Sequence, residues 1–508
     1  MNNLKEKIKL ILAAALSLSA VESAQAQATN QPKVDGVDVG IFVFDNMVYY
    51  NLNYAGGPLP LKEFMLYKSA EYYFTLNPLA TYSTLYKHNR FAKFQRENPS
   101  THIGGPMLGC IKSDGVSVWV RTIEPKSVRV IAEGADEKFE FSGETLVKND
   151  MAVTIELTGL RPNTKYRYRT YVGDDEIATD RDCHFTTLSN KAKGETRIVF
   201  GADYHRFGLC NRQLSQTIID RDPNAFLILG DIAVQDRENK LGYHCLDFFA
   251  RDLYPAWQNL SSKVPIYTTW DDHDYFCDDG YNVPKNYTAA DKEGVWRVFK
   301  NSWVNPSYGF GEEGKGVFHH STIGAADVIL LDNRYFREKG SLLGDEQQEW
   351  LKSTLLECEA PFIIIGCGTM FSDYVSSGKD SWGKFSPDAR EQIFDLIEEN
   401  NIKGVLLISG DRHGSRGFKM VRESGFTLYE FGSGSLGALG GQPDTTEEWG
   451  DMQLYGHSEI FAFGEFLFDT TKRDPTVTFR LLGESGDEIY TTTLKRSELT
   501  PRNFGRGL

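Results

Sequence analysis

The sequence lacks several features that would assign it to a class at once. Its 508 residues carry a formal net charge of −15, which argues against a broad surface for a nucleic-acid backbone. A small anionic substrate is still allowed, because bound cations reverse the local field. The glycines between 432 and 441 lack the spacing of a phosphate loop, so they are expected to form a flexible loop instead.

Cysteine is also scarce. The seven cysteines are odd in number and scattered, without the close pairs of a zinc finger. Most lie in or beside apolar runs, so they are expected to be small core residues. One disulfide is possible if the protein is exported, but the sequence does not choose the pair.

Long apolar runs are absent beyond the first 26 residues, so no transmembrane segment is expected in the rest of the chain. Residues 1–26 have the features of a signal peptide. A basic start with Lys5, Lys7 and Lys9 precedes a short apolar run, and Ala24-Gln25-Ala26 fits a cleavage site. We therefore expect a protein exported to the periplasm or the extracellular space. An N-terminus that anchors the chain in a membrane is the alternative.

Two regions follow the targeting segment. Residues 27–100 are aromatic and without a clean period, and we expect an N-terminal extension with helices over 62–74 and 89–97. Residues 101–189 contain short alternating strands at 116–121, 127–131 and 153–157, typical of a β-sandwich. The pattern Leu160, Pro162, Thr164, Tyr166 resembles fibronectin type III domains.

From residue 195 to 495 the pattern becomes strand, loop, helix. Continuous apolar runs predict strands buried on both faces. They cover 197–202, 225–229, 264–269, 327–331, 362–365 and 405–408. Helices are predicted over 345–357, with Trp350, Leu351, Leu355 and Leu356 inward, and after the cap Ser386-Pro387. The tail from 460 to 494 returns to alternating strands.

Polar residues that can bind metals follow these strands. The stretch 270–274, Trp-Asp-Asp-His-Asp, places three carboxylates and an imidazole within five residues. Crowded carboxylates need compensating cations, and strand ends in open α/β sheets are where ligands bind. Folding is expected to gather Asp203, His205, Asp231, Asp272, His273, Asp411 and His413. Asp and His suit zinc, iron or manganese, and Asp231 is placed to bridge two ions.

These motifs resemble the calcineurin-like metallophosphoesterases and, among them, the PhoD-like alkaline phosphatase D group. The resemblance covers about 103–494 and is carried by 230–231, 270–274, 331–337, 343–351 and 409–413. It implies a four-layer α/β/β/α metallophosphatase sandwich, preceded by the fibronectin III-like sandwich. It also implies that water attacks phosphorus at a dinuclear centre of iron, zinc, manganese or calcium ions.

The resemblance also implies roles for single residues. Asp203, His205, Asp231 and His413 would bind one ion, and Asp231, Asp272 and Asp411 the other. His273 would assist the leaving group and Asp274 would orient His273. Arg334 would clamp a phosphate oxygen, since a guanidinium fits that geometry. Arg206 and Arg412 are further candidates for substrate binding.

This chain departs from the family pattern at three places. Val234 stands where a tyrosine is common, and Asp203 stands where the PhoD group often has a cysteine. No middle histidine is evident, because the loop 366–370 offers only Cys367 and Thr369. We therefore expect no purple tyrosinate–iron site, and an oxygen-rich second site that favours calcium, manganese or magnesium.

The sequence thus predicts a secreted metal-dependent phosphoric-ester hydrolase, either a phosphodiesterase or an alkaline phosphomonoesterase. Two alternatives remain open. One is a phospholipase-type headgroup hydrolase, which needs an apolar rim near 432–441 or 49–74. The other is a non-catalytic surface-binding protein on a metallophosphatase fold. A phosphate ester is the expected partner, and the sequence leaves the oligomeric state open.

Overall fold

The structure is a computed structural model that describes residues 33–34, 37–38, 61–191, 193–374, 381–438 and 449–501. The chain divides into two compact units, Met1–Leu61 and Lys62–Leu508. In the first, β1 (Lys33–Val34) and β2 (Val37–Asp38) pair antiparallel. The predicted signal peptide lies outside the described residues. Among the described ones, every helix is too short or too polar to cross a bilayer.

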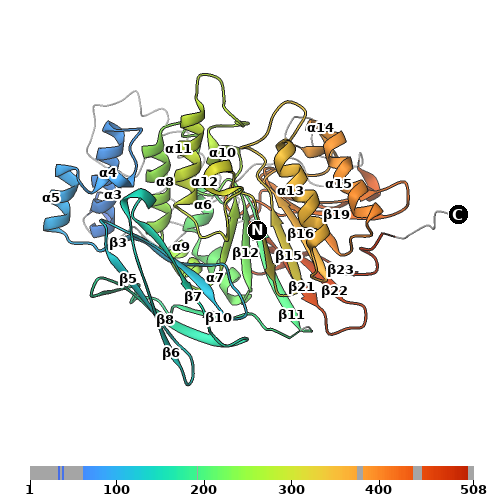
Figure 1. The fold of residues 1–508 in the computed structure, drawn as a ribbon, viewed down its shortest axis with the longest axis horizontal. Coiled ribbons are helices and arrows are strands. Elements are labelled where there is room, and N and C mark those ends of the chain that lie inside the picture. The colour runs from blue at the N-terminus through green and yellow to red at the C-terminus, as the bar shows by residue number, and fades with distance from the viewer. Residues whose placement is uncertain are drawn as a thin grey trace. The chain divides into compact units, whose positions relative to one another are not determined.

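The second unit begins with three helices: α3 (Leu61–Leu76), α4 (Tyr82–Leu85) and α5 (Asn89–Glu97). Both helices predicted in this extension are therefore confirmed. Aromatic rings join them to α8 (Leu241–Leu253), where Phe249 contacts Tyr67 edge-on and stacks on Tyr82. The Tyr82 hydroxyl also donates to the Cys245 carbonyl at 2.5 Å. Figure 1 shows α3 and α4 near α8, and these ring contacts join segments that are far apart in sequence.

Residues 102–186 form two antiparallel sheets. One contains β3 (His102–Gly109), β4 (Val116–Thr122) and β7 (Ala152–Leu157). The other contains β5 (Ser127–Glu133), β6 (Lys138–Glu144), β8 (Lys165–Val172), β9 (Asp175–Ile177) and β10 (His184–Thr186). Inward residues of both sheets share one core, as in a β-sandwich. The Tyr166 hydroxyl accepts from the Arg161 backbone at 2.9 Å, which closes the turn that begins at Leu160.

The remainder contains two larger sheets. The six-stranded sheet has the order β13-β12-β11-β21-β22-β23, and the seven-stranded sheet has the order β14-β15-β16-β17-β19-β18-β20. The first comprises β11 (Glu195–Gly201), β12 (Ala225–Leu229), β13 (Ile266–Thr269), β21 (Ala462–Asp469), β22 (Thr476–Gly483) and β23 (Glu488–Lys495). The second comprises β14 (His319–Ile323), β15 (Ala326–Leu330), β16 (Phe362–Cys367), β17 (Val405–Ser409), β18 (Gly414–Val421), β19 (Thr427–Gly432) and β20 (Gln453–Ser458).

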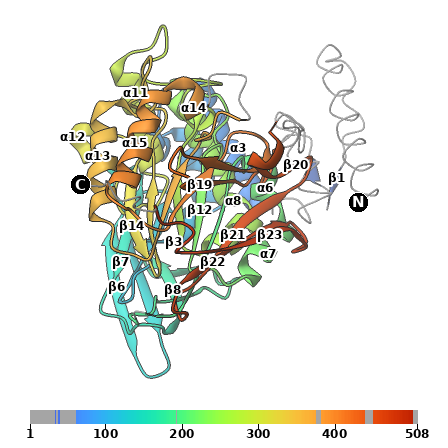
Figure 2. The same ribbon diagram turned by 90° about the vertical axis from the view of Figure 1, so that its right-hand side faces the viewer.

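Successive side chains of a strand point to opposite faces of its sheet, and this arrangement lets the two sheets and their helices pack as four layers. Leu406 and Ile408 of β17 face a core shared with Phe200 of β11, whereas Val405 and Leu407 face α13 (Gly344–Glu357) and α15 (Pro387–Glu399). On the other side, α7 (Arg212–Asp220), α8 and α9 (Pro255–Ser261) cover the first sheet (Figures 1 and 2). The predicted α/β/β/α fold class is confirmed.

Smaller elements complete the description: η2 (Val147–Asn149), α6 (His205–Cys210), α10 (Asp272–Tyr275), α11 (Ala289–Lys300), α12 (Gly311–Gly314), α14 (Trp382–Phe385) and η3 (Gly450–Met452). Two local predictions are wrong. Leu356 is 55% exposed, because it lies one residue past the inward Leu355. Ser386 begins α15 without a side-chain cap, because its hydroxyl accepts from the Leu342 backbone at 3.2 Å.

Candidate metal centre

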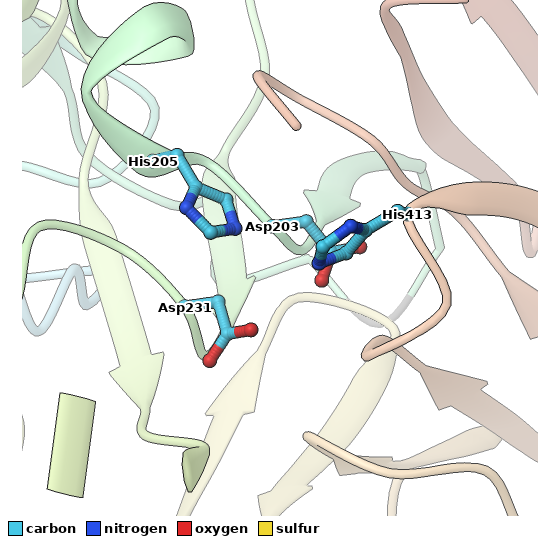
Figure 3. Close-up of side chains that lie close together, drawn as sticks. All are labelled: Asp203, His205, Asp231 and His413. Carbon is cyan, nitrogen blue, oxygen red and sulfur yellow. The ribbon is translucent and has the colours of Figure 1, made fainter. Parts of the chain in front are cut away.

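The carboxyl ends of parallel strands from both sheets meet at one edge. Asp203 and His205 follow β11, Asp231 follows β12, and Asp411 and His413 follow β17. Figure 3 shows the side chains of Asp203, His205, Asp231 and His413 directed toward one another. This is the edge at which open α/β sheets bind ligands.

The backbone at this edge is strained. The φ angles of Asp203, His205, Asp231, Asp411 and His413 are 54°, 44°, 52°, 73° and 46°. Side-chain-bearing residues rarely adopt this left-handed region, and such residues cluster at functional sites. The packing of the strand ends therefore holds these five residues in an unfavourable backbone conformation.

Glycine makes two of these strand ends possible. Gly230 has φ +94°, and a Cβ there would lie 2.5 Å from Cβ of Asp271. A Cβ at Gly434 would lie 2.5 Å from Oδ2 of Asp203. At Gly230 the backbone of Asp271 also lies within 3 Å of that Cβ, so only glycine fits, whereas at Gly434 a side chain would force the Asp203 carboxylate to move.

The first group of ligands consists of Asp203, His205, Asp231 and His413, whose donor atoms lie within 4.8 Å of one another. Within the described part of the chain, Nε2 of His205 and Oδ1 of Asp231 are buried without a hydrogen-bond partner. Nδ1 of His205 faces Gln235, which leaves Nε2 for another ligand. Buried polar atoms without partners are costly, so the group fits a bound cation.

A second group contains oxygen only. Donor atoms of Asp271, Asp272 and Asp411 lie within 4.8 Å of one another, and Oδ2 of Asp271 has no hydrogen-bond partner among the described residues. Asp231 joins the two groups, since it also clusters with Asp272 and His273. A carboxylate shared in this way is placed to bridge two ions.

Asp271 packs against the loop after β16, where the sequence offers no middle histidine. Gly368 follows β16, and a Cβ there would lie 2.6 Å from Cγ of Asp271. A histidine at this place has no room for its side chain. Asp271 presents its own carboxylate to the second group.

Crowding of the carboxylates disturbs their pKa values. Burial, reinforced by Asp272 and Asp271, raises the pKa of Asp231 well above its usual range. Burial also raises the pKa of Asp203 to about 6 and, together with Asp271, that of Asp411 strongly. Burial and the neighbouring His413 lower the pKa of His205 to about 3. Metal binding requires a neutral imidazole and ionised carboxylates, so a bound cation would stabilise that protonation state.

Arg334 lies behind this centre. Its side chain is fully buried, with Nε 2.5 Å from Oδ1 of Asp271 and Nη2 3.7 Å from Oδ1 of Asp272. Asp271 also accepts from Nδ2 of Asn333 at 2.7 Å. This placement balances the charge of two carboxylates, so the predicted clamp on a phosphate oxygen has a competing structural role.

The two other arginines differ from each other. Arg206 is buried and paired with Asp247 of α8, which also pairs with Arg237. Its predicted contact with substrate is therefore replaced by an ion pair inside the fold. Nε of Arg412 lies 3.4 Å from Oδ2 of Asp411, and its Nη2 is buried without a hydrogen-bond partner among the described residues. Arg412 thus keeps donor capacity beside the centre.

His273 is held by a residue that the sequence did not suggest. Nδ1 of His273 lies 2.8 Å from Oδ1 of Asp236, while Nε2 lies 3.9 Å from Oδ2 of Asp231. Burial lowers the pKa of His273, but the hydrogen bond to Asp236 and the charge of Asp272 outweigh it and raise the pKa to about 9.

Asp274 is predicted to orient His273, but the structure pairs Nδ1 of His273 with Asp236. Asp274 is buried and its Oδ1 accepts from the Ile232 backbone at 3.0 Å, because adjacent residues of the short helix α10 point in different directions. It therefore ties the end of β13 to the loop after β12. Asp236 lies five residues after Asp231, a spacing for which the motifs gave no signal.

Three other histidines, His244, His319 and His320, lie outside the donor groups of the centre. Nε2 of His244 donates to the Glu238 carbonyl at 2.8 Å, as expected of a structural residue. His319 is buried, and His320 pairs with Asp327 at 3.1 Å. All seven cysteines lie in the described residues and are free thiols, so the possible disulfide is not formed.

Comparison with known proteins finds chains similar to this one. The family described as PhoD-like phosphatase matches residues 249–479, and a domain of unknown function (DUF7800) matches residues 100–190. Alkaline phosphatase D from Bacillus subtilis (strain 168) is 23% identical over 377 residues. That match covers 60% of this chain and 63% of the relative, so it spans less than two thirds of the relative's length.

Two solved structures share the fold. The one described as the structure of PhoD has a TM-score of 0.64 at 15% identity, covering 79% of this chain and 92% of that chain. The purple acid phosphatase PPD1 from yellow lupin (Lupinus luteus) seeds has a TM-score of 0.57 at 16% identity, covering 78% and 75%. The resemblance predicted from the motifs is confirmed.

Proposed function

The chain is a relative of the PhoD-like phosphatases, and we propose that it is a metal-dependent phosphoric-ester hydrolase with a dinuclear centre. One observation supports this proposal most strongly. Asp231 belongs both to the group Asp203, His205, His413 and to the group around Asp272. A shared carboxylate between two donor sets is what a pair of ions about 3.5–4 Å apart requires.

The donor sets differ in hardness. The first combines two carboxylates with two imidazoles, which suits zinc, iron or manganese. The second, with Asp271, Asp272 and Asp411, is built from oxygen alone and suits calcium, manganese or magnesium. When bound, such ions lower the pKa of a water and neutralise charge on a phosphate group.

The residues around the centre divide the remaining tasks. His273 protonates the departing oxygen, since Asp236 holds its ring and favours the protonated form. Arg412 donates to an equatorial phosphate oxygen, whereas Arg334 balances the charge of Asp271 and Asp272. With water as the nucleophile, no covalent phospho-enzyme is required.

We further propose that the enzyme is exported, with 1–26 as its signal peptide and 27–100 as an extension. Residues 101–189 serve as a scaffold sandwich and 195–495 as the catalytic domain. The aromatic contacts of Tyr67 and Tyr82 with Phe249 support a packing role for the extension.

Hydrolysis of two aryl esters tests this function. The protein is assayed with an aryl phosphate monoester and an aryl phosphate diester, with chelator and then with added calcium, manganese, zinc or iron. Metal-dependent cleavage of either ester is the expected result, and the ratio of the two rates assigns diesterase or monoesterase activity. Bound metal without turnover on either ester would favour the non-catalytic binding protein instead.

A further inference from the structure

A second cluster of metal-binding side chains lies apart from the strand-end centre. It contains His320 of β14, Asp327 of β15 and Cys358, which follows α13. One donor atom from each residue lies within 4.8 Å of the others. Asp327 is near the start of β15, whereas Asp332 and Arg334 follow the end of that strand. The cluster is therefore at the opposite end of the strand from the proposed catalytic residues.

Asp327 is the centre of this cluster. Its Oδ1 accepts from Nε2 of His320 at 3.1 Å and from the Thr322 hydroxyl at 2.6 Å. Its Oδ2 accepts from the backbone of Glu359 and Ala360 at 3.0 and 2.9 Å. Ligating carboxylates are fixed by hydrogen bonds of this kind, so the carboxylate is held in place before any ion binds.

The two other donors point at this carboxylate. Burial and the charge of Asp327 raise the pKa of the Cys358 thiol to about 12, so the thiol keeps its proton without metal. Both Nε2 of His320 and the thiol sulfur thus present a proton to one carboxylate. A divalent cation can take the place of these two protons: the proton of Cys358 is released to solvent, and that of His320 moves to Nδ1, so the imidazole stays neutral.

The cluster is open to solvent. The side chain of His320 is 33% exposed, and Cys358 lines a surface cavity of about 230 Å³ together with Ile402 and Arg496. The cluster is therefore reached from solvent at two of its donors, Cys358 through this cavity and His320 through its exposed side chain. Zinc binds sulfur at about 2.3 Å and imidazole at about 2.0 Å, usually with four ligands.

From this geometry we propose that His320, Asp327 and Cys358 form a zinc site, separate from the strand-end centre. The ion would join the edge hairpin β14–β15 to the segment between α13 and β16. A thiolate, an imidazole and a carboxylate select zinc over calcium or magnesium, which prefer oxygen ligands. A site with this position would stabilise the fold and take no part in phosphate chemistry.

Cobalt(II) is the probe that distinguishes this site, because thiolate ligation gives an intense near-ultraviolet charge-transfer band. The strand-end groups contain only Asp and His, so their cobalt complexes lack such a band. The full-length protein is stripped of metal and titrated with cobalt. We expect the band to reach the intensity of one cobalt–thiolate bond per chain, and we expect added zinc to abolish it.

Variants assign the band to its ligands. Cys358→Ser should lose it, and His320→Asn, which keeps the thiol, should weaken cobalt binding at this site at least tenfold. Cys277→Ser is the matched control, since Cys277 lies near Asp272 and should leave the band unchanged. Absence of the band in the wild type, or its persistence in Cys358→Ser, would overturn the site and show a hydrogen-bonded cluster only. Neither result bears on the aryl-ester assay.

Discussion

Asp236 and His273 form a carboxylate–imidazole pair, with Oδ1 2.8 Å from Nδ1. The pair joins the loop after β12 to α10, and it directs Nε2 of His273 to within 3.9 Å of Asp231. A carboxylate on Nδ1 fixes the orientation and tautomer of an imidazole and favours its protonated form. Asp236 is thus a positioning residue for the proposed general acid.

The variant Asp236→Asn should reduce kcat by roughly 10- to 100-fold, as losses of such orienting partners do. It removes a negative charge from His273, so the pKa of His273 falls. Because a general acid must be protonated, the alkaline limb of the kcat–pH profile should move to lower pH. Asp278→Asn, on an exposed carboxylate of a nearby loop, should leave the profile in place. An unshifted alkaline limb in Asp236→Asn would show that Asp236 does not position His273 as the general acid.

His273 and Asp272 are neighbours with separable tasks. His273→Ala should keep the bound metal and lower turnover by roughly 10²–10⁴-fold, the usual contribution of acid–base catalysis. Asp272→Ala should lose metal and activity together, because its carboxylate belongs to the second group and also clusters with Asp231 and His273. Elemental analysis and hydrolysis rates on the same preparations make the comparison. Full activity in His273→Ala would contradict the role of His273 as general acid.

The two arginines near the centre should respond differently to truncation. Arg412→Ala should weaken inhibition by inorganic phosphate about tenfold or more, with little effect on unfolding. Arg334→Ala leaves Asp271 and Asp272 without their buried partner, so in chelator it should destabilise the fold by about 3–5 kcal/mol. Phosphate inhibition and denaturant unfolding measure the two effects. A stable Arg334→Ala protein with weakened phosphate binding would restore the clamp role to Arg334.

His319 makes stability depend on pH at a place remote from the centre. Burial lowers its pKa to about 3, so the folded state holds it neutral while the unfolded chain takes up a proton near pH 6.5. Its stabilisation is present above that pH and declines by about 1.4 kcal/mol per unit as the pH falls toward 3.

Comparison with His319→Gln isolates this contribution. Between pH 7 and pH 5 the wild type should lose roughly 2 kcal/mol more of its free energy of unfolding than the variant. Denaturant titrations at both pH values, with the metal concentration fixed, provide the measurement. Parallel losses in the two proteins would show that His319 is solvated or paired in the fold.

The colour of the metal-loaded protein reports on the first group of ligands. Val234 is buried where a tyrosine would provide a phenolate, and His205 and His413 complete the group without one. The iron-loaded protein should therefore lack an intense visible charge-transfer band. Visible absorption after loading with ferric iron checks this, and a purple protein would require a tyrosine that enters the centre.

Much of this structure could be predicted because strands and their ends leave local signals. Continuous apolar runs such as 225–229 coincide with β12, and the Asp and His residues after such runs meet at one edge. Partners that depend on three-dimensional packing leave none. Asp247, which pairs with Arg206, lies 41 residues further along the chain, and Asp236 reaches His273 from another loop.

Motif position alone did not predict which way the side chains of Arg334 and Asp274 face. Arg334 follows a strand as expected, but its side chain is enclosed behind Asp271 instead of facing the open edge. Asp274 is adjacent to His273 in sequence and still points to the Ile232 backbone. A motif fixes which residues arrive at the sheet edge, whereas helix geometry and packing decide which way each one faces.

The number of ions bound around Asp231 tests the central claim most directly. In a Cys358→Ser background, which removes the proposed zinc site, metal content and aryl-ester hydrolysis are measured before and after Asp231→Asn. The account predicts two ions per chain in the parent, at most one in the Asp231→Asn protein, and loss of hydrolysis with the second ion. Two ions and undiminished hydrolysis in the Asp231→Asn protein would contradict a shared carboxylate at a dinuclear centre.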